Sequence, residues 1–319
     1  MFLRVIVAAT LTATAAFAET PVLRAAVLDS GTVNWELDTI EREGLDAANG
    51  FDLQVQGVAG SPAAQIAFQA GEADVIVSDW LWVARQRAEG RDYVFIPYSK
   101  AVGALLVPPG SDAQTLEDLR GGEIAIAGGP LDKSWLILRA YASSEHGMDL
   151  AAETTQTFGA PPLIHETALR GDYDGEINFW HWNAKGVAAG MRELVTVSDA
   201  ATALGLDPDT PLLGYVLNGE MARDNPALVD GLVAASRSAK ELLATDDAAW
   251  EALRERMRPA DDAEFEALKA GYIEGIPADG PVDEDAAARM LKLMAELGGE
   301  ELIGEATELP EGVFLQPAS

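Results

Sequence analysis

The residues of this 319-residue chain best suited to holding a ligand are its tryptophans, four of which stand in two close pairs. One pair is Trp80 with Trp82, and the other is Trp180 with Trp182. Indole rings stack on flat ligands and hold cations over their negative faces. Residues two apart share a face on a strand but point in different directions on a helix. The alternative interpretation is therefore that at least one indole of each pair packs into the core. We predict that Trp80, Trp180 and Trp182 contact a small molecule.

Polar residues stand beside these tryptophans. The run NFWHWN contains Asn178, which can donate and accept hydrogen bonds, and His181, whose charge can change near neutral pH. Asp79 comes directly before Trp80. A lone histidine among aromatic residues is also common in a core or at its rim, which is the alternative here. We predict that Asp79, Asn178 and His181 contact the ligand.

Predicted helix starts supply further candidates. Ser61 comes before Pro62, which predicts an N-cap and a proline at the first helical position, and Lys133 opens another predicted helix that includes Trp135. Free N–H groups at helix starts hold anionic or carbonyl oxygens, and Lys133 can neutralise an anion. Ordinary capping and a solvated lysine would explain Ser61 and Lys133 without any ligand. Under the functional interpretation, Ser61, Lys133 and Trp135 line the binding site.

Two strand ends complete the set of candidates. Asn34 and Trp35 fall in the first strand-to-helix connection, and Tyr98 lies at the end of the third predicted strand. Ligands of open α/β sheets bind beyond the carboxyl ends of the strands, so these side chains would face the same crevice. Packing beneath a loop is the alternative for each of them.

An internal repeat positions these residues. Pro62, Gly71 and Asp74 recur one hundred residues later, in step with the tryptophan pairs. In each copy a proline opens a short helix, a glycine ends it, an apolar strand follows and two tryptophans close the unit. We interpret the glycine as a helix terminator and the aspartate as a turn cap, outside the binding site. The repeat predicts two similar lobes with a cleft between them.

The remaining pattern predicts an α/β fold with a central cleft. Strands are predicted at 23–28, 93–99 and 123–127, and a return crossing between lobes at 194–217. The first lobe is predicted to cover residues 19–103 and the second lobe residues 104–205. Residues 206–319 are predicted to return to the first lobe and add C-terminal helices, which begin near Asp246, Asp261 and Asp283.

Composition limits the location and the partners. Residues 1–18 carry one arginine, an apolar run and an A-F-A site, a pattern typical of a secretory signal peptide. The chain has no cysteine, which excludes disulfides, thiolate metal ligands and a lipidated anchor. We therefore expect a soluble, unlipidated periplasmic protein. A formal net charge of -30 argues against nucleic acid as a partner.

The chain resembles a known family, the periplasmic solute-binding proteins of ABC importers that include sulfonate, taurine and nitrate binders and the NMT1/THI5-like pyrimidine binders. The resemblance lies in GSPAAQIAFQAGEADVIVSDW (60–80), TLEDLRGGEIAIAGG (115–129), the second G-D-x-D (171–174) and the helix DNPALVDGLVAASRSA (224–239). It implies a type II periplasmic-binding fold, with two lobes on a two-strand hinge that close on a solute. It also implies an ABC permease and its ATPase as partners.

Catalytic and metal-binding motifs are absent from the sequence. GxSxG, GxxxxGK[ST], HExxH and GxGxxG do not occur, and GDYDGE (171–176) lacks the downstream ligands of a calcium loop. We expect a monomeric solute receptor without enzymatic activity, cofactor or metal. The alternatives are a THI5-like pyrimidine-forming enzyme and a receptor that reports to a membrane signalling partner. Indoles and few basic groups favour a planar or quaternary nitrogen compound, or a zwitterion with its anion at Lys133.

Overall fold

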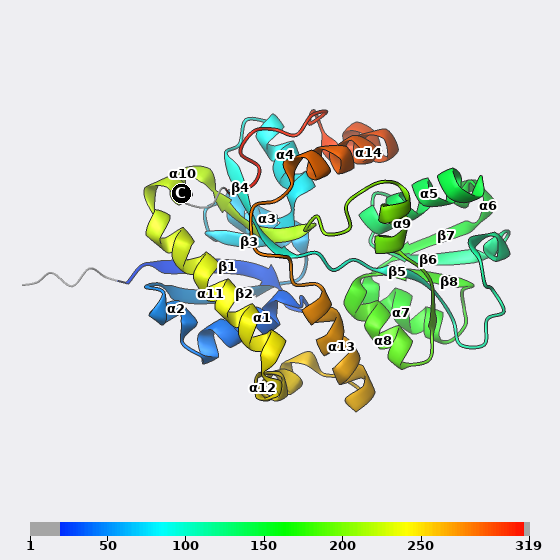
Figure 1. The fold of residues 1–319 in the computed structure, drawn as a ribbon, viewed down its shortest axis with the longest axis horizontal. Coiled ribbons are helices and arrows are strands. Elements are labelled where there is room, and N and C mark those ends of the chain that lie inside the picture. The colour runs from blue at the N-terminus through cyan, green and yellow to red at the C-terminus, as the bar shows by residue number, and fades with distance from the viewer. Residues whose placement is uncertain (1–19, 316–319) are drawn as a thin grey trace, which may run out of the picture.

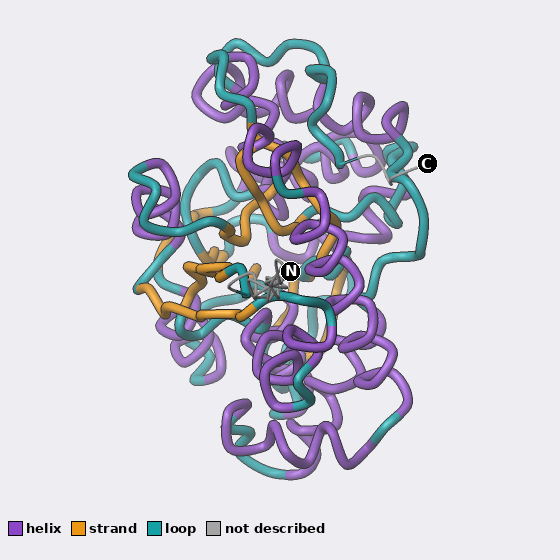
Figure 2. The backbone as a smooth tube through the Cα atoms, turned by 90° about the vertical axis from the view of Figure 1, so that its left-hand side faces the viewer, coloured by secondary structure: helices purple, strands orange, loops and turns teal. Residues whose placement is uncertain are grey.

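The computed structural model describes residues 20–315, which form an α/β molecule with two lobes (Figure 1). The predicted α/β fold of two lobes is confirmed. The expected signal peptide, residues 1–18, lies outside the described residues. Figure 2 shows helices above and below the strands, one of which runs along the left edge of the view. None of the helices in the described part combines the length and the apolar character needed to cross a membrane.

Each lobe is built on one five-stranded sheet. The first sheet has the order β2-β1-β3-β10-β4, and the second has the order β7-β6-β8-β5-β9. The strands of the first sheet are β1 (Val22–Leu28), β2 (Asp52–Val58), β3 (Val75–Asp79), β4 (Tyr93–Ser99) and β10 (Leu213–Asn218). The strands of the second sheet are β5 (Ala104–Val107), β6 (Glu123–Ala127), β7 (Thr155–Gly159), β8 (Gly175–Asn178) and β9 (Arg192–Thr196).

The chain crosses between the sheets twice. Segment 100–103 leads from β4 into β5, which pairs antiparallel with β8 and β9 of the second sheet. Segment 204–212 leads back into β10, which pairs antiparallel with β3 and β4 of the first sheet. We name these two stretches the crossing segments. The second one falls inside the predicted return crossing.

The internal repeat is present in the structure. Helix α3 (Ser61–Gln69), strand β3 and helix α4 (Trp80–Ala88) recur as α7 (Pro161–Leu169), β8 and α8 (Trp180–Ala188). The same offset relates α1 (Val33–Arg42) to α5 (Lys133–His146).

The turn before the strand is built in the same way in both copies of the repeat. The carboxylate of Asp74 accepts the backbone N–H of Arg24 on β1 at 2.9 Å, and that of Asp174 accepts the N–H of Glu123 on β6 at 2.8 Å. Gly71 and Gly171 follow their helices at φ 74 and φ 78, which favours glycine. The predicted terminator role of the glycines is therefore confirmed, whereas each aspartate ties its turn to the neighbouring strand instead of capping the turn itself.

The remaining helices lie mainly in the C-terminal part. They are α2 (Leu45–Ala48), η1 (Leu116–Leu119), α6 (Leu150–Glu153), α9 (Val197–Ala203), α10 (Gly219–Asp224), α11 (Pro226–Thr245), α12 (Asp247–Met257), α13 (Asp262–Glu274) and α14 (Glu284–Ile303). The predicted starts near Asp246, Asp261 and Asp283 are confirmed, because each carboxylate caps its helix by accepting a backbone N–H.

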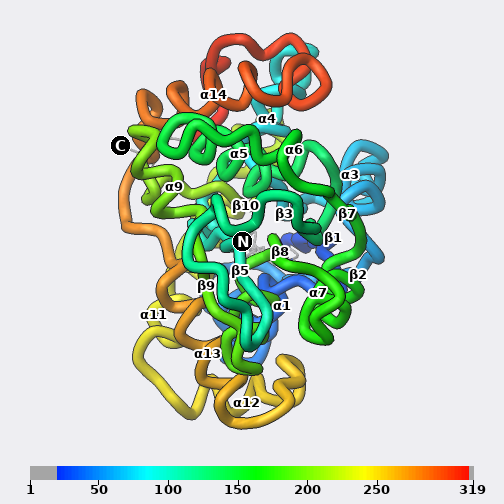
Figure 3. Tube along the Cα trace, turned by 90° about the vertical axis from the view of Figure 1, so that its right-hand side faces the viewer, coloured from blue at the N-terminus to red at the C-terminus, as the bar shows by residue number. Residues whose placement is uncertain are grey.

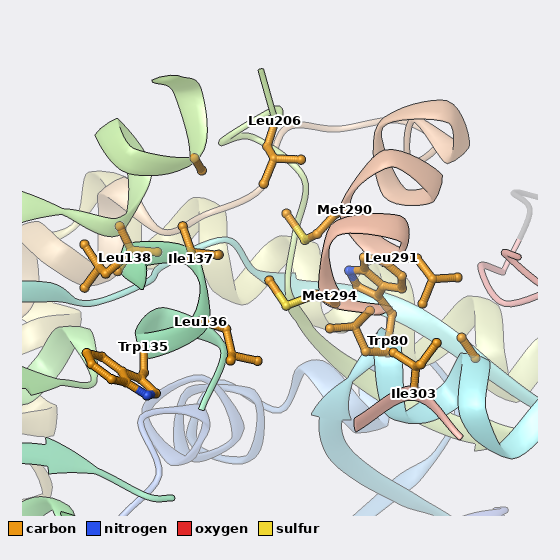
Figure 4. Packing of buried hydrophobic residues seen from close by; sticks show 14 of the residues in the cluster. Trp80, Trp135, Leu136, Ile137, Leu138, Leu206, Met290, Leu291, Met294 and Ile303 are labelled. Atoms are coloured by element: carbon orange, nitrogen blue, oxygen red, sulfur yellow. The ribbon is translucent and has the colours of Figure 1, made fainter. Parts of the chain in front are cut away.

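The last two helices bridge the lobes. Helix α13 packs against α8 of the second lobe, and α14 packs against both α4 and α5. In the view onto the second lobe, α14 lies above this lobe and α13 lies below it (Figure 3). One apolar core accordingly contains residues of both lobes. Figure 4 shows Met290 and Met294 of α14 between Trp80 of the first lobe and Ile137 of the second.

Candidate functional site

An ion pair joins the two lobes where β3 ends and α5 begins. Asp79 is the N-cap of α4 and accepts the N–H of Trp82 at 2.9 Å with one carboxylate oxygen. Its other oxygen accepts a hydrogen bond from Lys133 Nζ at 2.9 Å. Burial alone would lower the pKa of Lys133, but the charge and hydrogen bond of Asp79, helped by Asp132, raise it. The structure therefore brings together two predicted site residues from opposite lobes.

Two more predicted residues meet across the lobes. The rings of Trp35 and Trp180 stand edge to face, with centroids 5.9 Å apart. Trp35 is 6% exposed and packs on Trp250 and Tyr272. A Cβ atom at Gly271 of α13 would lie 2.8 Å from the Trp180 ring, so only glycine allows this close approach. Trp180 is thus held between α1 and α13.

A pocket lies beside Trp180 and the crossing segments. Its volume is about 580 Å³, within the range of small-molecule sites. Its wall combines residues of the second lobe, both crossing segments and α13. The lining includes Lys100, Trp180, Asn183, Glu193, Asp199, Asp209, Gly271 and Glu274. Motion about the crossing segments would therefore change the shape of this pocket.

His181 stands next to Trp180 in an aromatic cluster. Its ring centroid lies 5.7 Å from that of Trp180 and 5.6 Å from that of Trp182. Burial, and then the charges of Lys185 and His165, lower the pKa of His181 to about 4. The neutral imidazole is therefore the form that the folded protein favours, able to donate one hydrogen bond and accept another.

This depressed pKa predicts a pH dependence of stability. Between pH 6.5 and pH 4 the unfolded chain binds a proton at His181 that the folded chain does not bind, so acid lowers the free energy of unfolding over this window. Between pH 7 and pH 4.5, we expect the free energy of unfolding of His181→Asn to fall by about 2 kcal/mol less than that of the original protein. Urea denaturation of both proteins at the two pH values measures this. Equal losses in the two proteins would contradict the prediction.

Two predicted site residues, Asn34 and Asn178, serve the backbone instead of facing open space. Asn34 is 1% exposed and donates to the carbonyl oxygens of Leu28 and Gly31, each at 2.8 Å. Asn178 is also 1% exposed, donates to Glu176 and Pro161 and accepts the N–H of Phe179. Both asparagines hold strand-to-helix connections in place.

The prediction that Trp80 faces the cleft is wrong. Its side chain is 0% exposed and packs on Phe314 with centroids 5.8 Å apart, because α14 and the C-terminal segment cover this face of α4. Tyr98 and Trp135 are likewise buried, at 3% and 2% exposure. Tyr98 lies beneath the ammonium of Lys240, 5.0 Å from its ring centroid. All three side chains therefore lie in the core, which was the alternative interpretation for Trp80.

Ser61 and Trp182 take other positions. Ser61 is the first residue of α3, Gly60 is the N-cap, and no side-chain cap hydrogen bond forms there, so the predicted capping role of Ser61 is wrong. The exposed Ser61 side chain remains at a helix start. Trp182 packs beside His165, with centroids 5.4 Å apart, and lies 5.8 Å from Lys185 Nζ.

Sequence reasoning missed a buried charged cluster behind the site. The carboxylate of Glu36, 0% exposed, accepts hydrogen bonds from Tyr215 at 2.8 Å, Ser236 at 2.6 Å and Tyr272 at 2.9 Å. Lys240 Nζ completes it at 2.6 Å. We name these five residues the Glu36 cluster. It ties together α1, β10, α11 and α13. Of these, α1 carries Trp35, β10 follows the second crossing segment, and α13 forms a wall of the pocket.

Sequence reasoning also missed the walls of the pocket. Asn183 and the α13 residues Gly271 and Glu274 line it, and none of them carries a motif. Asn183 lies in the NFWHWN run that the sequence singled out, so its polar character was a usable signal. The part played by α13 depends on a helix that is distant in sequence from Trp180, and no local pattern announces it.

Comparison with known families assigns the chain to one of them. The family model described as NMT1/THI5 like matches residues 41–249, more than half of the chain. Among curated proteins, none matches the chain in sequence.

Solved structures share the fold across nearly the whole chain. The periplasmic aliphatic sulphonate binding protein SsuA from Escherichia coli is 19% identical, with a TM-score of 0.72, over 92% of this chain and 98% of that one. The alkanesulfonate-binding protein SsuA from Xanthomonas axonopodis pv. citri, bound to MOPS, is 18% identical, with a TM-score of 0.70 over 94% and 99%. A Candida albicans gene product with the generic periplasmic binding protein fold is 12% identical, with a TM-score of 0.59 over 94% and 99%. The expected periplasmic-binding fold is confirmed.

Proposed function

We propose that this chain, which belongs to the NMT1/THI5-like family, is the solute-binding component of an ABC importer. It captures a small organic solute between its lobes and delivers it to a membrane permease driven by an ATPase. The observation that carries this proposal is the pocket of about 580 Å³ beside the crossing segments. A site walled by both crossing segments and by elements that move with different lobes can be assembled and opened by a hinge motion.

Closure is the mechanism that the geometry supports. When the lobes approach, Trp180 of α8 contacts Trp35 of α1, and Asp79 reaches Lys133. These contacts join opposite lobes, so they form only in the closed arrangement. A solute against Trp180 adds its own contacts to that arrangement and shifts the population toward it.

Within this proposal, the ligand contacts are Trp180 and the rest of the pocket lining, and His181 stands outside the lining and next to Trp180. Trp35, Asp79 and Lys133 do not contact the solute but stabilise the closed arrangement of the lobes. The protein works in the periplasm as a monomer, without enzymatic activity or cofactor. The solved structures of similar fold that are described as sulfonate-binding proteins support a binding role of this kind.

A thermal-denaturation screen tests the proposal. The panel contains sulfonates, pyrimidines, amines, quaternary ammonium compounds and amino acids. A ligand at 100 times its dissociation constant adds about 2.7 kcal/mol, which raises the midpoint by roughly 5 °C for a protein of this size. We expect one chemical class to give this shift. A panel in which no compound moves the midpoint would contradict the proposed function.

A further inference from the structure

The ionisable residues around the pocket are mostly acidic. Glu193 of β9, Asp199 of α9 and Glu274 of α13 line it without an ion-pair partner among residues 20–315. Lys100 is the cation of the lining, and its ammonium is already paired with the fourth carboxylate, that of Asp209. The pocket therefore carries a net negative charge.

The unpaired carboxylates act on one another. Burial, and then the negative charges of Glu274 and Asp199, raise the pKa of Glu193. Three different elements supply these groups, so the closed arrangement itself brings like charges together. A cation placed in the pocket relieves this repulsion, whereas an anion adds to it.

A second observation points to a ligand in the same place. Asn183 lines the pocket and is 3% exposed. Its Oδ1 accepts the N–H of Ala104 at 2.8 Å, which establishes which atom is the oxygen. Its Nδ2 has no hydrogen-bond partner within the described residues. A buried donor left unpaired is costly, so this amide calls for an acceptor on the ligand.

A bare metal ion does not fit these groups. Nowhere in residues 20–315 do three histidine, cysteine, aspartate or glutamate side chains converge closely enough to hold one. Ca²⁺ takes six to eight oxygen ligands at about 2.3 to 2.6 Å, which dispersed carboxylates cannot supply. A larger ion with spread charge suits the pocket better, and the indole of Trp180 in its wall can hold such a cation against its face.

We infer that the solute is a small organic cation that also carries an uncharged hydrogen-bond acceptor. Its positive group lies among Glu193, Asp199 and Glu274 against Trp180, and its hydroxyl or carbonyl oxygen accepts the N–H of Asn183. This inference rests on the proposed solute-binding function and names the class of solute for the same site. It separates this chain from a receptor for sulfonates, whose negative group would meet unpaired carboxylates.

Three probes that differ in one group test the charge. Choline carries a trimethylammonium group, 3,3-dimethylbutan-1-ol carries the uncharged tert-butyl equivalent, and isethionate carries a sulfonate on the same hydroxyethyl chain. Isothermal titration of the full chain measures each affinity, with ethanolamine and propyltrimethylammonium as further cations. We expect choline to bind at least tenfold more tightly than the uncharged probe, and isethionate not to bind.

Matched variants locate the cation. Glu193→Gln and Glu274→Gln are each expected to weaken choline binding roughly fivefold, the scale of one charge pair near water. Glu266→Gln is the control, because Glu266 lies on the same helix as Glu274, has a side chain 65% exposed and stands outside the lining. Asn183→Asp keeps an oxygen for Ala104 and removes the donor, so it is expected to abolish any preference for the methyl ether of choline, whose oxygen accepts but cannot donate, over propyltrimethylammonium.

The outcomes separate the two proposals. If isethionate or another sulfonate binds and none of the cations does, the receptor function stands and the cation inference is wrong. If the variants at Glu193 and Glu274 bind choline as tightly as Glu266→Gln does, the assigned site is wrong. If neither the cations nor the sulfonates bind, both the inference and the proposed function fail.

Discussion

Replacing Glu36 by glutamine lowers the free energy of unfolding by about 3 to 5 kcal/mol, the cost of removing one partner of a buried ion pair. The substitution keeps the shape of the side chain but leaves the ammonium of Lys240 without its counter-charge. Burial already lowers the pKa of Lys240, even though Glu36 favours its charged form. Three hydroxyl groups also lose a charged acceptor. Urea denaturation at pH 7 measures the loss.

Two further variants show whether the loss comes from the ion pair. Glu43→Gln changes an exposed carboxylate beside the same helix, which is paired with Arg42 at the surface, and is expected to cost less than about 1 kcal/mol. The double variant Glu36→Gln with Lys240→Met removes both charges and is expected to be more stable than Glu36→Gln alone. A loss at Glu36 no larger than that at Glu43 would contradict the assigned importance of the cluster.

Replacing Trp180 by alanine is expected to weaken solute binding by at least about thirtyfold, the effect of truncating a well-packed aromatic contact. The indole lines the pocket and touches Trp35 and Gly271, so its removal takes away a ligand contact and one contact between the lobes. Isothermal titration with the compound that gives the largest thermal shift measures the change. The temperature is kept well below the midpoint of the variant, because the packing on α13 is lost too.

Trp182→Ala is the matched control for this experiment. It removes the same side chain from the same helix, but Trp182 packs beside His165 and does not line the pocket. We expect its affinity for the solute to stay within about threefold of the original, as for residues outside the centre of a binding site. Equal losses at both positions would mean that Trp180 acts through helix α8 as a whole and not by direct contact.

The repeat was predictable because its signals are local. A proline at a helix start and a glycine at its end each have a backbone reason at their own position. Gly71 could therefore be assigned from a few neighbouring residues, and the same pattern one hundred residues later predicted a second lobe, whereas the bond of Asp74 to Arg24 of β1 depends on the assembled sheet. The aspartates that open the last three helices were predictable for the same reason.

Which tryptophans face a pocket and which lie in the core could not be predicted from local signals. Trp80 and Trp180 hold equivalent positions at the starts of α4 and α8. Trp80 is covered by α14 and Phe314, whereas Trp180 meets Gly271 of α13 and lines a pocket. The difference lies in which C-terminal helix covers each position, and that depends on tertiary packing.

The Glu36 cluster lay beyond sequence reasoning for a related reason. Its hydrogen bonds join residues 179, 200 and 236 positions apart in the chain. Glu36 stands between Trp35 and Leu37 in the sequence of α1, and no local pattern names the partners of its carboxylate. Only the assembled first lobe brings the two tyrosines, the serine and the lysine around it.

A distance measurement between the lobes tests capture by closure most directly. The chain has no cysteine, so Ala70→Cys in the first lobe and Ala189→Cys in the second, both exposed, can carry spin labels without background. We predict that a saturating amount of the solute found in the screen narrows the distribution of distances between the two labels and moves it to shorter values. We also predict that Trp180→Ala prevents this change at the same solute concentration. An identical distribution with and without bound solute would contradict capture by closure of the lobes.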